Sequence, residues 1–384
     1  MVITIIGWYG TETVGDRAIL AGILKALFSV TDDIELNLGS IYPFFSERTV
    51  FEDYDFFKQI TNKSKIDINI FDSRSNRELN RMIDKCDLLI VSGGPLMDMP
   101  ALYLLEYAFK RAKKRKKKTA LIGCGLGPLT QKMYIKSTRE IINNSDCSIF
   151  RDEMSYKWCK EIGVKKDKLI LHAICPAAIA ANFYIEKNKD RLKKNSRIAF
   201  NAREFAYGTG HYKGASIEKM NDIIFNILSN VASNGNPIQL VPMHNFAIGI
   251  DDRILLNKLR LKLLAINPIV DIHVLNEPLN LEQTMESFAS AEYCIGMRFH
   301  SILFQTILNG NNYIIDYTDP ERGKTGAFLD QINGVEFYKE RYVNLQRNDN
   351  LTFELNHEKF LIDDNLISKY EDIYLTNLGN LMLN

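Results

Sequence analysis

The sequence predicts an α/β protein with two domains, each built around a parallel β-sheet. Its 384 residues exceed what a single hydrophobic core usually supports. Short apolar runs alternate with longer amphipathic segments along most of the chain, which is typical of folds in which helices connect parallel strands. Between Asn182 and Ser196 the chain becomes rich in Asn and Lys and loses this periodicity, which indicates a linker.

The first domain is expected over residues 1–182, and its opening run, residues 2–6, predicts a buried strand. The following helix is predicted because Ile19, Ile23 and Leu27 are spaced to lie on one face. The same alternation of apolar runs and amphipathic segments predicts the remaining elements of this domain. The strands are expected at 2–6, 34–38, 88–92, 119–124, 147–150 and 169–171, and the helices at 16–28, 77–85, 102–117, 132–144 and 153–162.

The second domain is expected over residues 197–340, after a linker at 183–196. Its pattern again favours parallel strands with crossover helices. The tail, 341–384, is helical in pattern over 361–377 and is expected to pack back across the domains. In the second domain the strands are expected at 197–201, 238–242, 270–274, 293–296 and 313–317, and the helices at 217–234, 251–264, 281–290 and 300–309.

Composition narrows the classes of function. With 48 basic and 47 acidic residues the net charge is +1, which argues against nucleic acid as a partner. The start of the chain lacks the features of a signal peptide, and no apolar run approaches the ~20 residues that span a bilayer, so we expect a cytoplasmic protein. The six cysteines lack the C-x-x-C spacing of a zinc site or a disulfide framework: Cys86, Cys124, Cys147, Cys159, Cys175 and Cys294.

Three glycine-rich loops follow predicted strands of the first domain, at 7–16, 92–98 and 123–129. Glycines at such junctions allow tight turns and close approach of a ligand to the backbone. The first loop is neither a Rossmann G-x-G-x-x-G motif nor a Walker loop, since no Lys-Ser/Thr pair follows it. The loops could instead serve only as turns, and Asp16 only as a helix cap. If they do line a binding site, Gly10, Asp16, Gly94 and Asp98 are the expected ligand contacts.

The segment 296–301 places Arg298 and His300 one residue apart, where a predicted strand leads into a helix. A helix N-terminus contributes partial positive charge and free N–H donors, so this junction favours an anionic ligand. Arg203 follows the first strand of the same domain, and two guanidinium groups could hold a carboxylate and a phosphate together. His244 also follows a strand, although a lone His is more often a structural hydrogen-bonding residue.

The run from Lys110 to Lys118 is basic at every position except Ala112. Cations at a helix C-terminus are favoured by the helix dipole and by solvation, and this is the simpler reading. Contact with an anionic membrane surface is the alternative.

Taken together, these motifs resemble the polysaccharide pyruvyl transferase family over roughly residues 3–330. Four positions depart from the family pattern: Thr13 where Asn is common, Pro95 in place of a third glycine, Cys124 where Gln is usual, and Ala177 where Asp is common. The resemblance is carried by Gly15-Asp16, Gly93-Gly94, 123–128, Arg151-Asp152-Glu153-Met154-Ser155, Met297-Arg298-Phe299-His300 and 316–320.

The resemblance implies a GT-B-like fold, with two Rossmann-like domains facing a cleft, and transfer of a pyruvyl group from phosphoenolpyruvate to a sugar as a cyclic ketal. The acceptor would belong to a bacterial surface polysaccharide or its lipid-linked precursor. The first domain would bind the acceptor and the second the donor, with no cofactor besides this co-substrate and no metal. Arg298 and His300 are the expected catalytic residues, His300 moving a proton with an ordinary pKa near ~6.5. The expected donor-binding residues are Arg203, Arg298, His244, Ser301 and Lys324.

Two other functions remain open at this point. A glycosyltransferase of the same architecture would bind a nucleotide-sugar diphosphate in its basic site. A non-catalytic sugar-binding protein would have the fold without turnover.

Overall fold

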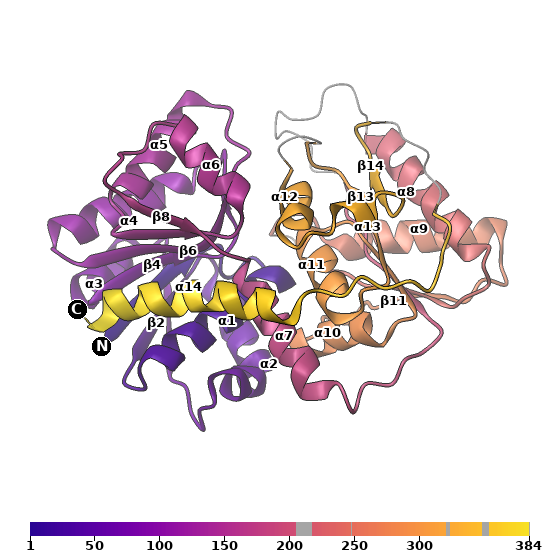
Figure 1. The fold of residues 1–384 in the computed structure, drawn as a ribbon, viewed down its shortest axis with the longest axis horizontal. Helices are drawn as coiled ribbons and strands as arrows, with labels where there is room; N and C mark the ends of the chain where they lie inside the picture. The colour runs from indigo at the N-terminus through magenta and orange to yellow at the C-terminus, as the bar shows by residue number, and fades with distance from the viewer. Residues whose placement is uncertain (205–216, 247, 320–322, 348–352, 384) are drawn as a thin grey trace. The chain divides into compact units, whose positions relative to one another are not determined.

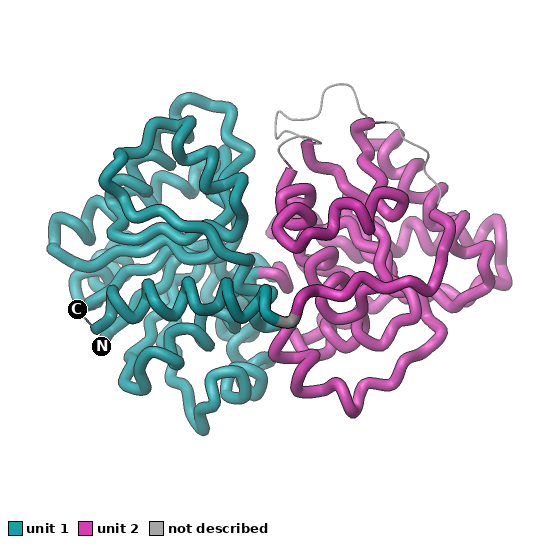
Figure 2. The backbone as a smooth tube through the Cα atoms, viewed as in Figure 1, with its two compact units in different colours: residues 1–12, 16–180, 364–384 teal, residues 13–15, 181–363 magenta. Residues whose placement is uncertain are grey.

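In the computed structural model, residues 1–204, 217–246, 248–319, 323–347 and 353–383 are described. The chain forms two compact units, each with its own parallel sheet (Figures 1 and 2). Unit 1 comprises residues 1–12, 16–180 and 364–384, and unit 2 comprises 13–15 and 181–363. The predicted α/β fold with two parallel sheets is confirmed.

The sheet of unit 1 has the strand order β3-β2-β1-β4-β6-β7-β8, with the short β5 paired to the end of β6. The direction in which the strand order proceeds reverses between β1 and β4, which pair in parallel. At such a switch point the loops that follow the two strands turn away from each other. The strands are β1 Val2–Gly7, β2 Glu35–Ser40, β3 Ile68–Asp72, β4 Leu88–Ser92, β5 Pro95–Leu96, β6 Lys118–Leu126, β7 Cys147–Phe150 and β8 Leu169–His172.

Helices cover this sheet and bury its apolar side chains. Leu89, Val91 and Leu121, from adjacent central strands, share one hydrophobic cluster with Leu105 and Phe109 of α4. Burial on both faces of the sheet explains why these strands appear in the sequence as continuous apolar runs. The helices are α1 Val14–Val30, α2 Pro43–Thr61, α3 Asn76–Lys85, α4 Leu102–Lys114, α5 Lys132–Asn143, α6 Glu153–Glu161, α7 Pro176–Asn188, which crosses into unit 2, and α14 Asp364–Leu383.

The C-terminal helix α14 packs on unit 1 (Figure 1). The hydroxyl of Tyr374 donates a 2.6 Å hydrogen bond to the carbonyl of Ile174, and both groups are buried. The Lys25 ammonium lies 2.8 Å from the Glu371 carboxylate. Unit 1 is therefore built from chain segments almost 200 residues apart.

The sheet of unit 2 has the order β11-β10-β9-β12-β13-β14 within the described residues. Its switch point lies between β9 and β12, which pair in parallel with Ile295 opposite Phe200. The elements are β9 Ile198–Phe200, α8 Ile217–Ala232, β10 Ile238–Leu240, α9 Asp252–Ile266, β11 Ile272–Val274, α10 Leu281–Ser290, β12 Tyr293–Gly296, α11 Phe299–Leu308, β13 Asn312–Asp316, α12 Lys324–Gln331, α13 Val335–Tyr338 and β14 Tyr342–Asn344.

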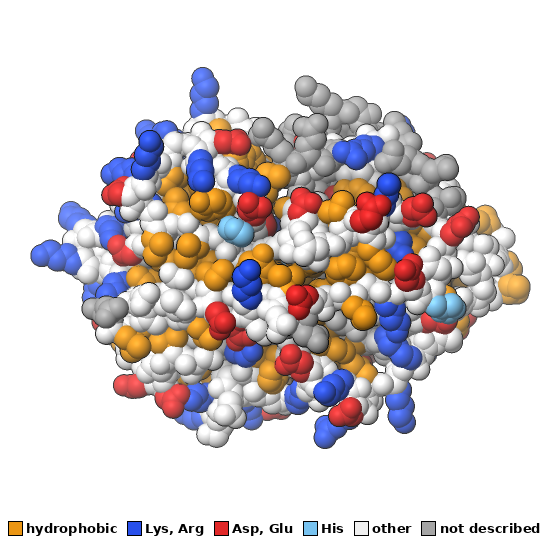
Figure 3. Space-filling model, in the orientation of Figure 1, with side chains coloured by type: hydrophobic (Ala, Val, Ile, Leu, Met, Phe, Trp, Pro, Cys, Tyr) orange, Lys and Arg blue, Asp and Glu red, His pale blue; other side chains and the backbone are white. Residues whose placement is uncertain are grey.

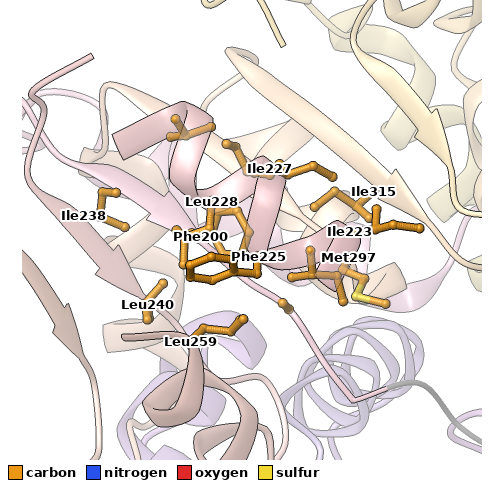
Figure 4. Close-up of a cluster of buried hydrophobic side chains, with 14 of the residues drawn as sticks. Phe200, Ile223, Phe225, Ile227, Leu228, Ile238, Leu240, Leu259, Met297 and Ile315 are labelled. Carbon is orange, nitrogen blue, oxygen red and sulfur yellow. The ribbon is translucent and has the colours of Figure 1, made fainter. Parts of the chain in front are cut away.

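The core of unit 2 lies between this sheet and the helices beside it, and Figure 4 shows Phe200, Leu228 and Ile315 among its side chains. Met297, the residue after β12 and before Arg298, is also in this cluster and is buried. Burying a side chain of this size contributes about 1.5–3 kcal/mol, so the backbone that carries Arg298 is held firmly.

The structure differs from the sequence prediction in several elements. The strand β3 and the helix α2 were not predicted. Most of β3 is only partly buried and lacks a clear apolar run, while α2 begins with Pro43 at a first-turn position that proline favours. The segment 183–196 is not wholly a linker, because α7 continues to Asn188. Residues 341–363 belong to unit 2 and include β14, so the tail joins unit 1 only from residue 364.

Among the described residues, no helix combines the length and the apolar character needed to cross a membrane.

Candidate functional site

Two arginines lie at the switch point of unit 2. Arg203 follows β9 and Arg298 follows β12, and these strands are neighbours in the sheet. The two loops also touch, since the backbone N–H of Arg203 lies 3.4 Å from the Met297 sulfur. Parallel topology therefore brings together two side chains separated by 95 positions in the sequence. Ligands of open α/β sheets bind at such edges.

The guanidinium of Arg298 is paired with a buried carboxylate. Its Nε lies 2.6 Å and its Nη2 2.5 Å from the two oxygens of Asp252, which is completely buried. Asp252 also accepts hydrogen bonds from the backbone N–H groups of Met243 and His244, both at 3.1 Å. The expectation of an open guanidinium fork is thus corrected: two nitrogens of Arg298 face Asp252, and the pair orients the side chain.

The start of α11 is held by Asn201, the residue after β9. Its Oδ1 accepts hydrogen bonds from the backbone N–H of Arg298 at 3.0 Å and the hydroxyl of Ser301 at 2.8 Å, while its Nδ2 donates to the carbonyl of Val241. Ser301 is fully buried. Its hydroxyl, predicted to contact the donor, has its hydrogen-bond partners at the start of the helix in this structure.

His244 is likewise engaged within the protein. Its Nε2 lies 2.8 Å from the carbonyl of Ile248 and its Nδ1 2.7 Å from the hydroxyl of Thr13. A carbonyl only accepts, so Nε2 carries the proton and Nδ1 accepts from Thr13. Burial, together with the positive charge of Arg298, lowers the pKa of His244 to about 4. The ring is therefore neutral near pH 7, and both of its nitrogens have hydrogen-bond partners within the protein.

His300 lies in the first turn of α11, beside Phe299 with ring centroids 5.1 Å apart. Its imidazole packs against the backbone of Gly15, which belongs to unit 2 together with Thr13 and Val14. A Cβ atom at Gly15 would lie 1.8 Å from the Nδ1 atom of His300. The glycine of the first loop therefore leaves the space that the imidazole occupies, a role that the sequence did not indicate.

Replacing Gly15 with Ala should displace the His300 ring and lower turnover by at least tenfold, since about 1 Å of misplacement can cost 10²-fold. Steady-state kinetics would measure the loss. The matched control is Gly326→Ala on α12, where an added Cβ meets nothing within 4 Å. An unchanged kcat in Gly15→Ala would show that the position of the ring does not matter.

A third cation and a tyrosine complete the site in unit 2. The hydroxyl of Tyr317, the residue after β13, lies 3.3 Å from the Lys324 ammonium and 3.4 Å from Nη1 of Arg203. Burial raises the pKa of Tyr317, but the positive charges of Lys324, Arg203 and Arg298 outweigh it and lower the pKa to about 7. We call Arg203, Arg298, Lys324 and Tyr317 the cationic cluster.

Neither Asp252 nor Tyr317 was predicted as a site residue. Their positions relative to predicted strands could have indicated them, since Asp252 follows the strand and loop that contain His244, and Tyr317 ends a predicted strand. The sequence did not indicate which residues they contact.

In unit 1 the loops that follow β1 and β4 contain the residues expected to contact the acceptor. Gly94 has φ +64, and an added Cβ would lie 2.3 Å from the Trp8 ring, while one at Gly10 would lie 2.3 Å from the Ser40 hydroxyl. These two glycines are therefore required by packing. Asp16 lies in the first turn of α1, with one carboxylate oxygen 3.5 Å from the Thr11 hydroxyl.

Asp98 holds the loop that leads into α5. Its Oδ2 accepts from the backbone N–H groups of Thr130 at 2.8 Å and Gln131 at 3.3 Å. Its other oxygen, Oδ1, is buried without a hydrogen-bond partner among the described residues. The carboxylate is thus partly structural and retains one acceptor oxygen.

A buried charge network supports the loop after β1. Arg17 forms a bidentate pair with Asp53, at 2.6 and 2.7 Å, and Arg48 lies 3.0 Å from Glu12 in the loop. Burial raises the pKa of Glu12 above its ordinary value. These pairs hold a loop residue whose φ of 60 is unusual for a side chain other than glycine.

The basic run lies where α4 ends and β6 begins, which is the amino end of that strand and not the edge with the glycine loops. Lys113, Lys116, Lys117 and Lys118 line a hollow of ≈ 400 Å³ together with Asp146. Lys113 is paired with Asp146, and Lys118 donates to the carbonyl of Leu381 on α14. Figure 3 shows Lys and Arg side chains projecting from the outer edge of unit 1.

In the described part of the chain, no three His, Cys, Asp or Glu side chains gather closely enough to hold a metal ion.

Comparison with protein families gives one match, to the polysaccharide pyruvyl transferase family over residues 14–320. This range includes the switch point of unit 2 and the cationic cluster except Lys324, and it begins after β1 of unit 1. No curated protein sequence matches the chain.

Solved structures with this fold include sugar-nucleotide enzymes. UDP-GlcNAc 2-epimerase from Methanocaldococcus jannaschii is 13% identical with a TM-score of 0.61, covering 99% of this chain and 100% of its own. UDP-N-acetylglucosamine 2-epimerase from Rickettsia bellii is 11% identical with a TM-score of 0.56, and the match covers 100% of this chain and 96% of the epimerase. A glycosyltransferase from Rickettsia africae is 12% identical with a TM-score of 0.52, and the match covers 100% of this chain and 95% of the glycosyltransferase. At these identities the likeness shows the GT-B-like fold alone.

Proposed function

Because the chain belongs to the polysaccharide pyruvyl transferase family, we propose that it transfers a pyruvyl group from phosphoenolpyruvate to a sugar and closes it into a cyclic ketal. The observation that carries the proposal is the cationic cluster of unit 2. Arg203 and Lys324 point to one hydroxyl at the switch point, and Arg298 adds its charge beside them.

Phosphoenolpyruvate suits this cluster because it carries a carboxylate and a phosphate on one small carbon frame. A guanidinium binds either group through two parallel hydrogen bonds, and an ammonium acts as a point charge on phosphate. In the proposal Arg203 and Lys324 bind the donor, and Arg298, oriented by Asp252, stabilises the charge of the departing phosphate.

The reaction requires one proton at the methylene carbon of the donor, and the two acceptor hydroxyls release two. One hydroxyl attacks the central carbon, phosphate leaves, and the second hydroxyl closes the ketal. Of the two protons released, one supplies the new methyl group and one leaves with phosphate or solvent. His300 is the proposed group that moves a proton, since its imidazole lies in the first turn of α11, where the helix dipole favours anions.

On the acceptor side we propose the loops of unit 1, with Asp16 and Asp98 as contacts for sugar hydroxyls. The two glycines, Gly10 and Gly94, would contribute backbone groups. A lipid-linked acceptor would bring the protein to an anionic membrane, and the basic hollow at Lys113 to Lys118 is the proposed contact. Loss of binding to phosphatidylglycerol vesicles in Lys116→Glu/Lys117→Glu would support that contact, and unchanged binding would contradict it.

The assay that tests the function offers phosphoenolpyruvate with galactose, mannose and glucuronate acceptors. The expected result is phosphate release matched by an acceptor product heavier by pyruvate minus water, seen by mass spectrometry. Turnover of nucleotide-sugars without use of phosphoenolpyruvate would instead indicate a glycosyltransferase. Acceptor binding with no turnover of either donor would indicate a non-catalytic sugar-binding protein.

A further inference from the structure

Tyr317 occupies an unusual position for a tyrosine. Its side chain is buried, with 6% of its surface exposed, and its carbonyl accepts a 3.0 Å hydrogen bond from the Gln346 side chain. The hydroxyl is approached by the Lys324 ammonium and the Arg203 guanidinium. The guanidinium carbon of Arg203 also lies 5.4 Å from the centre of the ring. The phenol is therefore held in place while two cations face its oxygen.

Ammonium and guanidinium groups only donate hydrogen bonds, so the Tyr317 oxygen must accept from both. Its own proton then has to point away from Lys324 and Arg203. Losing that proton improves both contacts, because a phenolate oxygen attracts the two cations more strongly than a hydroxyl.

Within the described residues, four other titratable groups around the site have partners or charges that do not reverse this balance. Arg298, before α11, adds positive charge, and Asp252 of α9 is turned to Arg298. Asp316, the preceding residue, accepts hydrogen bonds from Tyr342 and Thr318. His244 is neutral near pH 7. The positive charges of Lys324, Arg203 and Arg298 therefore outweigh burial and lower the pKa of Tyr317 to about 7.

We propose that Tyr317 is a proton-linked positioning residue of the donor site: its phenolate balances Arg203 and Lys324 in the free protein, and it takes up one proton when a dianion binds them. Bound phosphate or carboxylate then supplies the negative charge that the phenolate supplied before. The uptake is balanced by one proton from solvent for each dianion bound. That this dianion is phosphoenolpyruvate rests on the proposed function.

The affinity for a dianion should depend on pH in one direction. Above the free pKa of about 7, binding must first protonate the phenolate, so the affinity for a dianion falls on the order of tenfold per pH unit. Below that pKa the hydroxyl is already protonated and the affinity levels off. Protein stability follows the usual rule for a depressed acid: the phenolate's contribution is complete above the unfolded pKa of about 10 and is lost as the pH falls through 7.

Sulfate is the probe of choice, because it remains a dianion throughout this range and adds no titration of its own. Calorimetry in two buffers of different ionisation enthalpy gives the protons taken up per sulfate bound. At about pH 8.5 we expect close to one proton in the wild type and none in Tyr317→Phe. The matched control is Tyr293→Phe in the same unit, since the pKa of Tyr293 is raised and it cannot supply the effect.

Ultraviolet titration of the ligand-free protein provides a second measurement. Of the 17 tyrosines, one should ionise near pH 7 in the wild type, and this step should be missing in Tyr317→Phe. Absence of that step, or sulfate binding without proton uptake, would overturn the proposal. Proton uptake in a protein that does not turn over phosphoenolpyruvate would leave this inference standing and remove the proposed function, whereas turnover without uptake would do the reverse.

Discussion

Replacing Arg298 with Ala is expected to lower the free energy of unfolding by about 3–5 kcal/mol and to abolish turnover. The reason is that the substitution leaves the buried carboxylate of Asp252 without its positively charged partner. Asp252 is completely buried at the start of α9, and Arg298 provides two of the hydrogen bonds that stabilise its charge. Denaturant unfolding followed by circular dichroism measures the first effect, and release of phosphate from phosphoenolpyruvate measures the second.

The adjacent pair Arg253 and Asp251 offers a matched control. Its Nη2 and Oδ2 atoms lie 2.6 Å apart, and both side chains retain some exposure to solvent, 20% and 13%. Arg253→Ala should therefore cost about 1 kcal/mol or less. The double variant Arg298→Met/Asp252→Asn should regain most of the lost stability, because no unpaired charge remains and the amide oxygen can still accept from Met243 and His244, and it should still be inactive. A loss below 1 kcal/mol in Arg298→Ala would contradict the buried pair.

The largest effect on turnover without a loss of stability is expected from His300→Ala. Removing a general acid or base typically costs 10²–10⁴-fold in kcat. The His300 side chain is only partly buried, so we expect the free energy of unfolding to change by no more than about 1 kcal/mol. The measurement is kcat for phosphoenolpyruvate alongside thermal unfolding.

His300→Gln tests the same role with a side chain that can still donate a hydrogen bond but cannot carry the proton. It should be nearly as inactive as His300→Ala. His273→Ala is the control, because that histidine is exposed and its ring lies 2.7 Å from the Asp271 carboxylate. If His300→Ala retained a tenth or more of the wild-type kcat, proton transfer would have to be assigned to another group.

Much of the architecture was predictable because it depends on local patterns. Alternating apolar and amphipathic segments predicted most strands and helices of both sheets, since a strand buried on both faces must be apolar throughout. Several elements were missed, and among them β3 lacks that signal because it is only partly buried. Position at strand ends correctly predicted that Arg203 and Arg298 lie together, because parallel strands leave their sheet at one edge.

The partners of the site residues were not predictable in the same way. Asp252 and Arg298 are 46 residues apart, and Tyr317 and Arg203 are 114 apart. Their contacts depend on the order of β9, β12 and β13 in the sheet and on how α9 approaches its edge. Ser301 and His244 are further examples, since the sequence did not indicate that their polar atoms form hydrogen bonds within the protein.

The segment Arg298-Phe299-His300 separates what the sequence determines from what only the tertiary structure determines. The sequence alone determined that a cation and an imidazole stand at a strand-to-helix junction, because apolar periodicity changes there from strand to helix. Only the tertiary structure decided that the cation is bound by Asp252, that the imidazole fits the space left by Gly15, and that Tyr317 lies between Arg203 and Lys324. The physical reason is that hydrogen bonds and charge pairs depend on distance in space, which periodicity along the chain does not record.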